Sequence, residues 1–163
     1  CLLLALLAEC PQATGLGIDI APRAVEQARM NANKNNLGDR AEFRVRNWLD
    51  DLTERFDIIV SNPPYIAQSD ILLLQQEVRE HDPMLALDGG NDGLDAYCML
   101  VPLLRDYLNP NGCVAFEVGQ GQAAPVCTLL QDNDFRVVNV RRDLGGVERC
   151  VVAIPQVESK SYF

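Results

Sequence analysis

Short apolar, β-branched runs alternate with helix-like segments along this chain. The strand-like runs are residues 14–20, 41–45, 56–60 and 113–118, and helical patterns occupy much of the sequence between them. Strands that alternate with helices predict a mostly parallel sheet with helices on both faces. The 163 residues, 48% of them hydrophobic, are enough for one domain with a sizeable core. The sequence therefore predicts an α/β fold.

The end of the chain departs from this alternation. Two strand-like runs, 135–141 and 147–154, flank the turn Asp143-Leu144-Gly145-Gly146. Two strands joined by so short a turn form a hairpin and must be antiparallel. The sequence therefore predicts an α/β sheet with an antiparallel hairpin at its end, which the all-parallel dinucleotide-binding fold lacks.

Residues typical of helix ends mark the limits of most of the remaining segments. Pro22 suits the first position of a helix that runs to about Asn36, and Gly38 is its predicted left-handed cap. A second long helix is predicted over 94–108, before the turn signal at 109–112. The remaining predicted helices are a buried one over 1–9, a short one over 71–78 and one that ends near 132.

An unusual turn follows the strand at residues 56–60. Asn62 ends that strand, and Pro63 and Pro64 can continue neither a sheet ladder nor a helix interior. In open α/β sheets, ligands bind at the carboxyl ends of strands. The Asn62 side chain and the Pro63 backbone each offer a carbonyl oxygen, and two such acceptors can hold both hydrogens of one planar NH2 group. Tyr65 can supply a flat wall for the held group.

Charge, cysteine usage and hydropathy exclude several function classes. The formal net charge is -9, with no basic run, which disfavours extended contact with a nucleic-acid backbone. Six cysteines without a C-x-x-C pair, beside the single histidine His81, predict neither a metal site nor a disulfide framework. Buried, reduced thiols of a cytoplasmic protein are expected instead. The apolar run 1–8 lacks a basic flank and is too short to span a bilayer, so no membrane role is expected.

Five segments, taken in order, resemble the HemK/PrmC family. They are Gly17-Ile18-Asp19, Asn47-Trp48, Asn62-Pro63-Pro64-Tyr65, residues 87–95 and residues 143–149. This resemblance covers nearly the whole chain and implies a class I SAM-dependent methyltransferase (Rossmann-like) fold, whose sheet also ends in an antiparallel hairpin. It implies a cytoplasmic enzyme that uses S-adenosyl-L-methionine to methylate the amide nitrogen of the Gly-Gly-Gln glutamine in class I peptide chain release factors.

The resemblance assigns the turn to catalysis and substrate binding. Asn62 and the Pro63 carbonyl are expected to hold the substrate amide in line with the methyl group, and Asn62 also to contact the cofactor. Pro64 and Tyr65 complete the substrate-binding turn, with Tyr65 beside the reacting group. No general base is required before transfer, so none is named. The glycines at 89, 90 and 93 are expected to serve backbone geometry.

Three further residues are expected to bind the cofactor. Asp19 ends a strand and either accepts hydrogen bonds from the ribose hydroxyls or caps a turn, and its spacing to the other motifs favours the ribose role. Trp48 either packs beside the adenine, as in the family, or belongs to the core. Asn47 stands where the family commonly has Asp, which predicts weaker adenine binding.

The start of the chain suggests a partial methyltransferase domain over residues 1–163. The family's Gly-rich cofactor loop, the strand before it and an N-terminal helical domain would precede Cys1. That strand lies between the strands that end at Asp19 and Asn62. Without it, these two strands pair directly or leave open edges, which favour aggregation. We expect an active full-length protein, whereas this chain alone binds cofactor weakly.

Three alternative functions share this pattern. A nucleic-acid adenine N6-methyltransferase uses the same Asn-Pro-Pro-Tyr turn, although the acidic charge and the absence of a basic groove oppose it. A ribosomal-protein glutamine methyltransferase is the second, but the segment 143–149 resembles the release-factor type more. The third is an inactive α/β binding module, which cofactor titration would distinguish.

Overall fold

The computed structural model describes residues 1–49 and 51–156, which divide into two compact units. The first unit is Cys1–Leu52, and the second begins at Thr53. Each unit has its own strands and its own packed helices, so each is described by itself. The partial methyltransferase domain predicted over residues 1–163 stays a prediction, and its last seven residues lie outside the described part.

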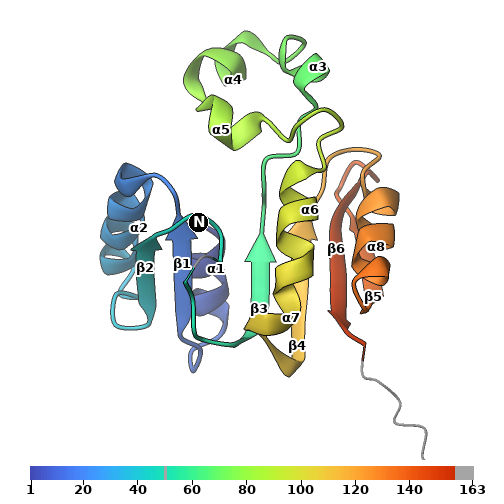
Figure 1. The fold of residues 1–163 in the computed structure, drawn as a ribbon. Helices are drawn as coiled ribbons and strands as arrows, with labels where there is room; N and C mark the ends of the chain where they lie inside the picture. The colour runs from blue at the N-terminus through green and yellow to red at the C-terminus, as the bar shows by residue number, and fades with distance from the viewer. Residues whose placement is uncertain (50, 157–163) are drawn as a thin grey trace, which may run out of the picture. The chain divides into compact units, whose positions relative to one another are not determined.

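A pair of parallel strands forms the centre of the first unit (Figure 1). The strands are β1 (Gly15–Asp19) and β2 (Ala41–Val45), and the helices α1 (Leu2–Glu9) and α2 (Pro22–Lys34) pack against them. Both strands begin and end within a residue of the predicted runs. The βαβ arrangement predicted from the alternating pattern is therefore confirmed in this unit.

The core of the first unit lies between α2 and β2. Val25 and Ala32 are buried against Phe43, and Ala28 packs beside them. The helix ends at Lys34, and Asn36 takes the left-handed conformation, with a φ of 57°. The prediction of Gly38 as the left-handed cap is therefore wrong. Asparagine tolerates this conformation better than most residues, so the turn forms two residues earlier.

The helix α1 is less buried than its composition predicts. Leu7 is its only buried residue, and Leu2 is 50% exposed. The carboxyl end of α1 is held by Arg40, whose guanidinium donates hydrogen bonds to the carbonyls of Leu7, Cys10 and Ala13 at 2.9, 3.0 and 2.9 Å. A cation suits this end of a helix because the last carbonyls have no partner within it.

The second unit contains a four-stranded mixed sheet (Figure 1). Its strands are β3 (Phe56–Ser61), β4 (Leu108–Glu117), β5 (Phe135–Arg142) and β6 (Glu148–Pro155), in the order β3-β4-β6-β5. β3 and β4 are parallel, whereas β6 is antiparallel to both β4 and β5. The predicted antiparallel hairpin is confirmed. Among the described strands, β1 pairs only with β2 and β3 only with β4, which is the open-edge alternative.

The pairing of β3 with β4 contains an irregularity. Phe56 pairs with Leu108 and Ile58 with Cys113, so five steps along β4 oppose two steps along β3. The residues 109–112, predicted as a turn before the strand, therefore lie inside β4. The Asn109 side chain donates a hydrogen bond to the Asp57 carboxylate at 2.7 Å and secures this bulge. The turn-forming residues bend the strand locally instead of ending it.

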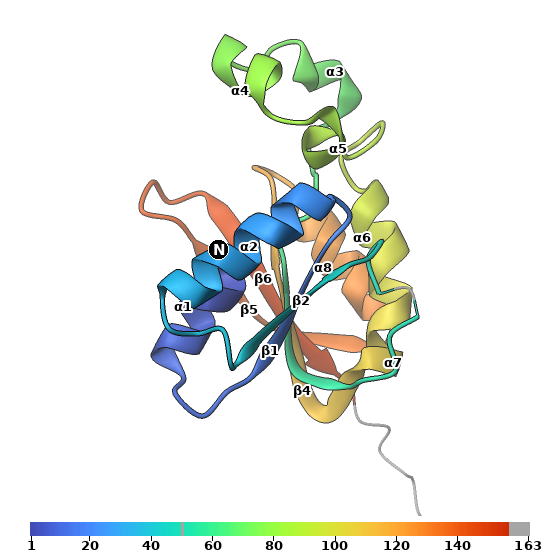
Figure 2. The same cartoon turned by 90° about the vertical axis from the view of Figure 1, so that its left-hand side faces the viewer.

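Three helices lie on one face of this sheet (Figures 1 and 2). They are α6 (Asp95–Leu100), α7 (Leu104–Tyr107) and α8 (Ala123–Asp132). The long helix predicted over 94–108 is wrong, because a 3-10 turn, Val101–Leu103, separates α6 from α7. Pro102 lies in that turn, and it lacks the N–H that a continuous helix requires.

A lobe of short helices follows the turn after β3 and lies beyond the carboxyl end of that strand (Figure 1). It comprises α3 (Gln68–Ile71), α4 (Gln76–His81) and α5 (Met84–Leu87), so the single helix predicted over 71–78 is wrong. The two ends of the lobe are held together by backbone hydrogen bonds. Ile66 donates its N–H to the Leu87 carbonyl at 3.0 Å, and its carbonyl accepts from Gly89 at 2.9 Å.

The six cysteines are free thiols, as predicted, but none is buried. Cys1, Cys10 and Cys98 are exposed, and the other three are half-buried, so the prediction of core thiols is wrong. Within residues 1–49 and 51–156, no helix has the length and apolarity needed to cross a bilayer.

Tyr97 anchors α6 to the sheet. Its side chain is fully buried, and its ring meets that of Phe116 edge to face, with centroids 5.5 Å apart. Its hydroxyl donates a hydrogen bond of 2.7 Å to the backbone carbonyl of Glu117. This contact fixes the carboxyl end of β4 against the helix layer.

Tyr97→Phe is expected to lower the free energy of unfolding by about 1–3 kcal/mol, because it leaves the half-buried Glu117 carbonyl without this donor. Urea unfolding followed by circular dichroism measures the change. Tyr107→Phe is the matched control: Tyr107 is half-exposed, with no hydrogen bond from its hydroxyl in the described structure, so a change within about 0.5 kcal/mol is expected. Equal effects of the two substitutions would contradict this role for Tyr97.

Candidate functional site

The turn after β3 presents two acceptors that have no hydrogen-bond partner among the residues described. Asn62 is exposed, and its side-chain amide forms no hydrogen bond with the described residues. The carbonyl of Pro63 likewise accepts none from them, although the residue itself is buried. Pro64 and Tyr65 are half-buried. The Asn62 amide is therefore exposed, and the Pro63 carbonyl accepts no hydrogen bond from the described residues, on a turn whose prolines restrict its backbone.

Glycines allow the loop before α6 to pass directly behind this turn. A Cβ on Gly89 would lie 2.8 Å from the Tyr65 Cα and 2.9 Å from the Pro64 carbonyl oxygen, which no side chain tolerates. Gly90 and Gly93 have φ values of 88° and 79°, in the left-handed region that favours glycine. The prediction that these glycines serve backbone geometry is confirmed.

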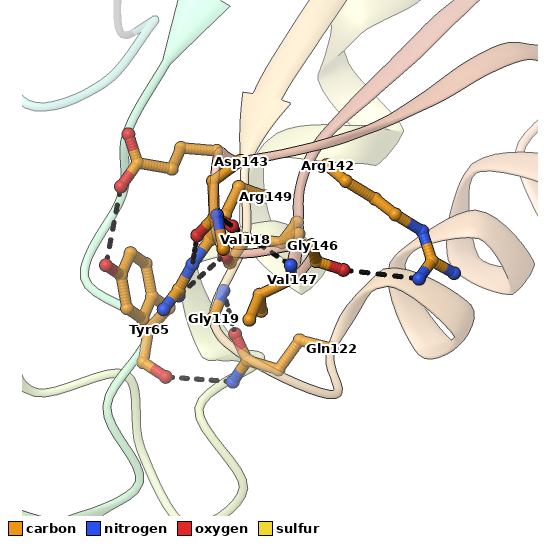
Figure 3. Close-up of polar contacts among 11 residues, drawn as sticks. Tyr65, Val118, Gly119, Gln122, Arg142, Asp143, Gly146, Val147 and Arg149 are labelled. Atoms are coloured by element: carbon orange, nitrogen blue, oxygen red, sulfur yellow. Dashed lines mark hydrogen bonds and ion pairs between the residues drawn. The ribbon is translucent and has the colours of Figure 1, made fainter.

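The Tyr65 ring is tethered to the end of β4 (Figure 3). Its hydroxyl donates a hydrogen bond of 3.4 Å to the Glu117 carboxylate. Burial, and after it the negative charge of Glu117, raises the pKa of Tyr65, while the nearby Arg149 partly opposes this shift. The phenol is therefore a neutral donor whose orientation depends on Glu117.

Asp143, in the turn between β5 and β6, and Arg149, near the start of β6, form a second polar group near Tyr65 (Figure 3). Arg149 donates to the Val118 carbonyl at 3.4 Å and lies 3.5 Å from the Asp143 carboxylate. Asp143 also accepts the backbone N–H groups of Gly145 at 2.8 Å and Val147 at 3.0 Å. The bond from Val147 is the main reason that the pKa of Asp143 is lowered, followed by the bond from Gly145.

Alkaline pH is expected to destabilise the second unit. The pKa values of Tyr65 and Tyr97 are raised, chiefly by burial, so folding favours their neutral forms. Their contribution to stability is fully present below the unfolded pKa, about 10, and is lost as the pH rises above it. Urea unfolding between pH 8 and about 11 measures this slope, which the double variant Tyr65→Phe/Tyr97→Phe should flatten. An unchanged slope in that variant would contradict the assignment.

A cleft of about 500 Å³ opens beside Tyr65 in the second unit. Its wall includes Asp92, Gly119, Gln122 and Pro125. Gln122 is a residue that sequence reasoning missed. Its side-chain amide donates to the Tyr65 carbonyl at 2.8 Å and accepts the Gly119 N–H at 2.9 Å (Figure 3). Its partner Tyr65 is far away in the sequence, so no local pattern could predict this contact. The only local signal for a role of Gln122 was its place directly after the Gly119-Gln120-Gly121 loop.

The other predicted site residues lie together in the first unit. Asp19 pairs with Val45 in the parallel register, so Asn47 and Trp48 follow β2 at the same edge where β1 ends. Asp19 accepts the Ala21 N–H through Oδ1 at 2.8 Å, which is a turn contact that occupies one of its two oxygens. Asn47 is exposed, and Trp48 is half-buried with a φ of 49°, which is rare for so large a residue.

The predicted site residues thus form two groups. Asp19, Asn47 and Trp48 belong to the first unit, and the turn from Asn62 to Tyr65 belongs to the second. His81 is exposed at the end of α4, as expected of a surface residue. Across the residues described, no three or more His, Cys, Asp or Glu side chains are grouped to hold a metal ion.

A protein-family model matches more than half of the chain. The model of the family described as "Methyltransferase small domain" matches residues 1–90. This match covers more than half of the chain and includes both β1 and the turn after β3.

Curated relatives are similar over nearly the whole chain. A release factor glutamine methyltransferase of Rhodospirillum rubrum is 50% identical over 153 residues, which are 94% of this chain and 47% of that protein. One of Bradyrhizobium diazoefficiens is 48% identical over 93% of this chain and 52% of that protein. The predicted resemblance is therefore confirmed. This chain spans about half the length of the relatives it matches.

Solved structures show the same fold at low sequence identity. A methyltransferase from Pyrococcus furiosus superposes with a TM-score of 0.70 and 19% identity, over 94% of this chain and 69% of that one. This likeness shows the fold alone. The predicted class I methyltransferase-like fold, with a mixed sheet that ends in an antiparallel hairpin, is confirmed.

Proposed function

Because this chain belongs to the methyltransferase small domain family, we propose that the full-length protein methylates the side-chain amide nitrogen of a glutamine in a class I peptide chain release factor, with S-adenosyl-L-methionine as the methyl donor. One observation supports this proposal: Asn62 and Pro63 present two acceptors on one proline-restricted turn, and neither has a hydrogen-bond partner among the described residues. The relatives named for release factor glutamine methylation, at 48–50% identity, supply the substrate class.

In this proposal, Asn62 and Pro63 orient a poor nucleophile. The lone pair of an amide nitrogen is delocalised into its carbonyl, so the nitrogen attacks only when it is well aligned. The Asn62 Oδ1 and the Pro63 carbonyl oxygen each accept one hydrogen of the substrate NH2, which fixes the direction of its lone pair. Orientation of this kind is worth up to about 7–11 kcal/mol in favourable cases. Tyr65, tethered to Glu117, supports the flat face of the held amide.

The first unit offers two acceptor oxygens and an aromatic ring that fit the adenosine part of the cofactor. Asp19 retains one carboxylate oxygen beyond its turn contact for a ribose hydroxyl. Asn47 is exposed and offers an amide oxygen to the adenine amino group, and Trp48 offers a partly exposed ring for its face. When bound, the cofactor supplies an electrophilic methyl group.

We place the reaction in the cytoplasm, where release factors act in translation.

The test is methyl transfer from labelled S-adenosyl-L-methionine, catalysed by the full-length protein that carries this sequence. A purified class I release factor and duplex DNA are offered together as substrates, and the label is located by mass spectrometry. Label on the Gly-Gly-Gln glutamine is expected. Label on adenine would replace this proposal by a nucleic-acid methyltransferase, and label on neither would leave only the fold. A release factor with that glutamine changed to glutamate is the control that should remain unlabelled.

A further inference from the structure

Gln122 links three loops at the carboxyl end of the sheet in the second unit. The residue directly precedes α8, and its backbone carbonyl already accepts the Val126 N–H of the first helical turn at 3.1 Å. Its side chain turns back from the helix toward Tyr65 (Figure 3). Gln122 is half-buried there, so the contacts of its amide are partly shielded from water.

The side-chain amide of Gln122 matches the backbone groups around it. Its Nε2 donates to the Tyr65 carbonyl at 2.8 Å and to the Gly93 carbonyl at 3.3 Å, while its Oε1 accepts the Gly119 N–H at 2.9 Å. The Nε2 also donates to the Asp92 carbonyl at 3.5 Å. An amide has two donor hydrogens and an acceptor oxygen, so its two hydrogens serve three backbone carbonyls while its oxygen holds one N–H. These partners come from the turn after β3, the loop before α6 and the loop after β4.

Two glycines leave the space that this amide occupies. A Cβ on Gly93 would collide with the Gln122 Nε2 and with the Tyr65 carbonyl oxygen. A Cβ on Gly119 would lie 2.6 Å from the Gln122 Oε1. Backbone, glycines and amide therefore fit together closely, and a side chain of another shape or polarity cannot make the same contacts.

We propose that Gln122 is a positioning residue for the amide-holding turn, an inference that rests on the proposed function. By binding the Tyr65 carbonyl, it fixes the end of the turn whose other end carries Asn62 and Pro63. It does not touch the substrate amide. Instead, it limits rotation of the turn, so that the two acceptors keep the spacing that matches one NH2 group. A displacement of about 1 Å in such a group can cost about 100-fold in rate.

The experiment compares two substitutions in the full-length protein. Gln122→Glu keeps the shape but places a carboxylate oxygen opposite the Tyr65 and Gly93 carbonyls, whereas Gln122→Met keeps the length and removes all the hydrogen bonds of the side-chain amide. The matched controls are Gln131→Glu and Gln131→Met, at an exposed position in the same helix α8. The assays are kcat and KM for the release factor, together with the thermal midpoint of each variant.

Both Gln122 variants are expected to lose at least about 10-fold in kcat, with KM for the release factor changed less than about 3-fold. We expect kcat to fall more than KM changes because the side-chain amide of the substrate glutamine is a small part of the surface by which the release factor binds. The Gln131 controls should keep wild-type values. The inference is overturned if kcat is unchanged, if only KM changes, or if activity falls only in proportion to the unfolded fraction. If the wild type itself transfers no methyl group to the release factor, the proposed function fails first and the inference fails with it.

Discussion

Asn62→Ala is expected to lower kcat for release-factor methylation by at least about 100-fold without lowering the thermal midpoint. Removing one preorganised hydrogen-bonding group from a catalytic site typically costs about 10²–10³ in kcat. Here the loss removes one of two acceptors, so the substrate NH2 can rotate about its remaining hydrogen bond. Stability is unaffected because the Asn62 side chain is exposed and makes no hydrogen bond with the described residues.

Two further variants define what Asn62 contributes. Asn62→Asp keeps an acceptor oxygen at the same distance from the backbone, so it should retain more activity than Asn62→Ala. Asn139→Ala is the matched control at an exposed position of β5, and it should behave as wild type. Steady-state kinetics with labelled cofactor measure all three. Wild-type kcat in Asn62→Ala would exclude the amide-holding role of the turn.

Gly89→Ala is expected to lower both activity and stability. The added Cβ would contact backbone atoms on three sides, at 2.8 Å from the Cα atoms of Tyr65 and Gly93 and at 2.9 Å from the Pro64 carbonyl oxygen. Backbone cannot move aside as a flexible side chain does, so the turn itself must shift. Overpacking of this kind costs about 1–3 kcal/mol in the free energy of unfolding. Displacing the turn should cost about 100-fold in kcat.

The control for this clash is Gly145→Ala in the hairpin between β5 and β6. A Cβ there meets only the Asp143 side chain, at 3.2 Å, and neither glycine has the left-handed φ that would add strain of its own. Gly145→Ala should therefore change the free energy of unfolding by less than about 1 kcal/mol. Urea unfolding and kcat measured on the same preparations separate the two effects. A Gly89→Ala variant as stable and active as Gly145→Ala would contradict the close packing behind the turn.

Local signals predicted the elements that depend on local chemistry. β2, the start of α2 at Pro22 and the antiparallel hairpin agree with the structure because strand propensity, Pro at a helix start and a short Gly-rich turn act over a few residues. Predictions failed where another influence opposed the local signal. Residues 109–112 favour a turn, yet pairing with β3 holds them in β4 as a bulge. Pro102 breaks the predicted long helix, although the apolar pattern continues through it.

The sequence predicted the turn from Asn62 to Tyr65, but it did not predict which residues hold that turn in place. Gln122 is 57 residues from Tyr65 along the chain, and no periodicity or spacing rule connects them. The hydrogen bond from Tyr97 to the Glu117 carbonyl also joins distant segments. Such contacts follow from how the loops meet at the end of the sheet, which is a property of the assembled fold rather than of any single segment.

The exposed Asn62 amide, which has no hydrogen-bond partner among the described residues, affects how mutational data on this protein should be interpreted. A selection that scores only the amount of folded protein responds to Tyr97 or Gly89, whose neighbours depend on them. It does not detect changes at Asn62, because that side chain is exposed and forms no hydrogen bond with the described residues. Variants that abolish the proposed chemistry would pass such a selection as neutral. Abundance measurements alone would therefore rank the central residue of the turn as dispensable.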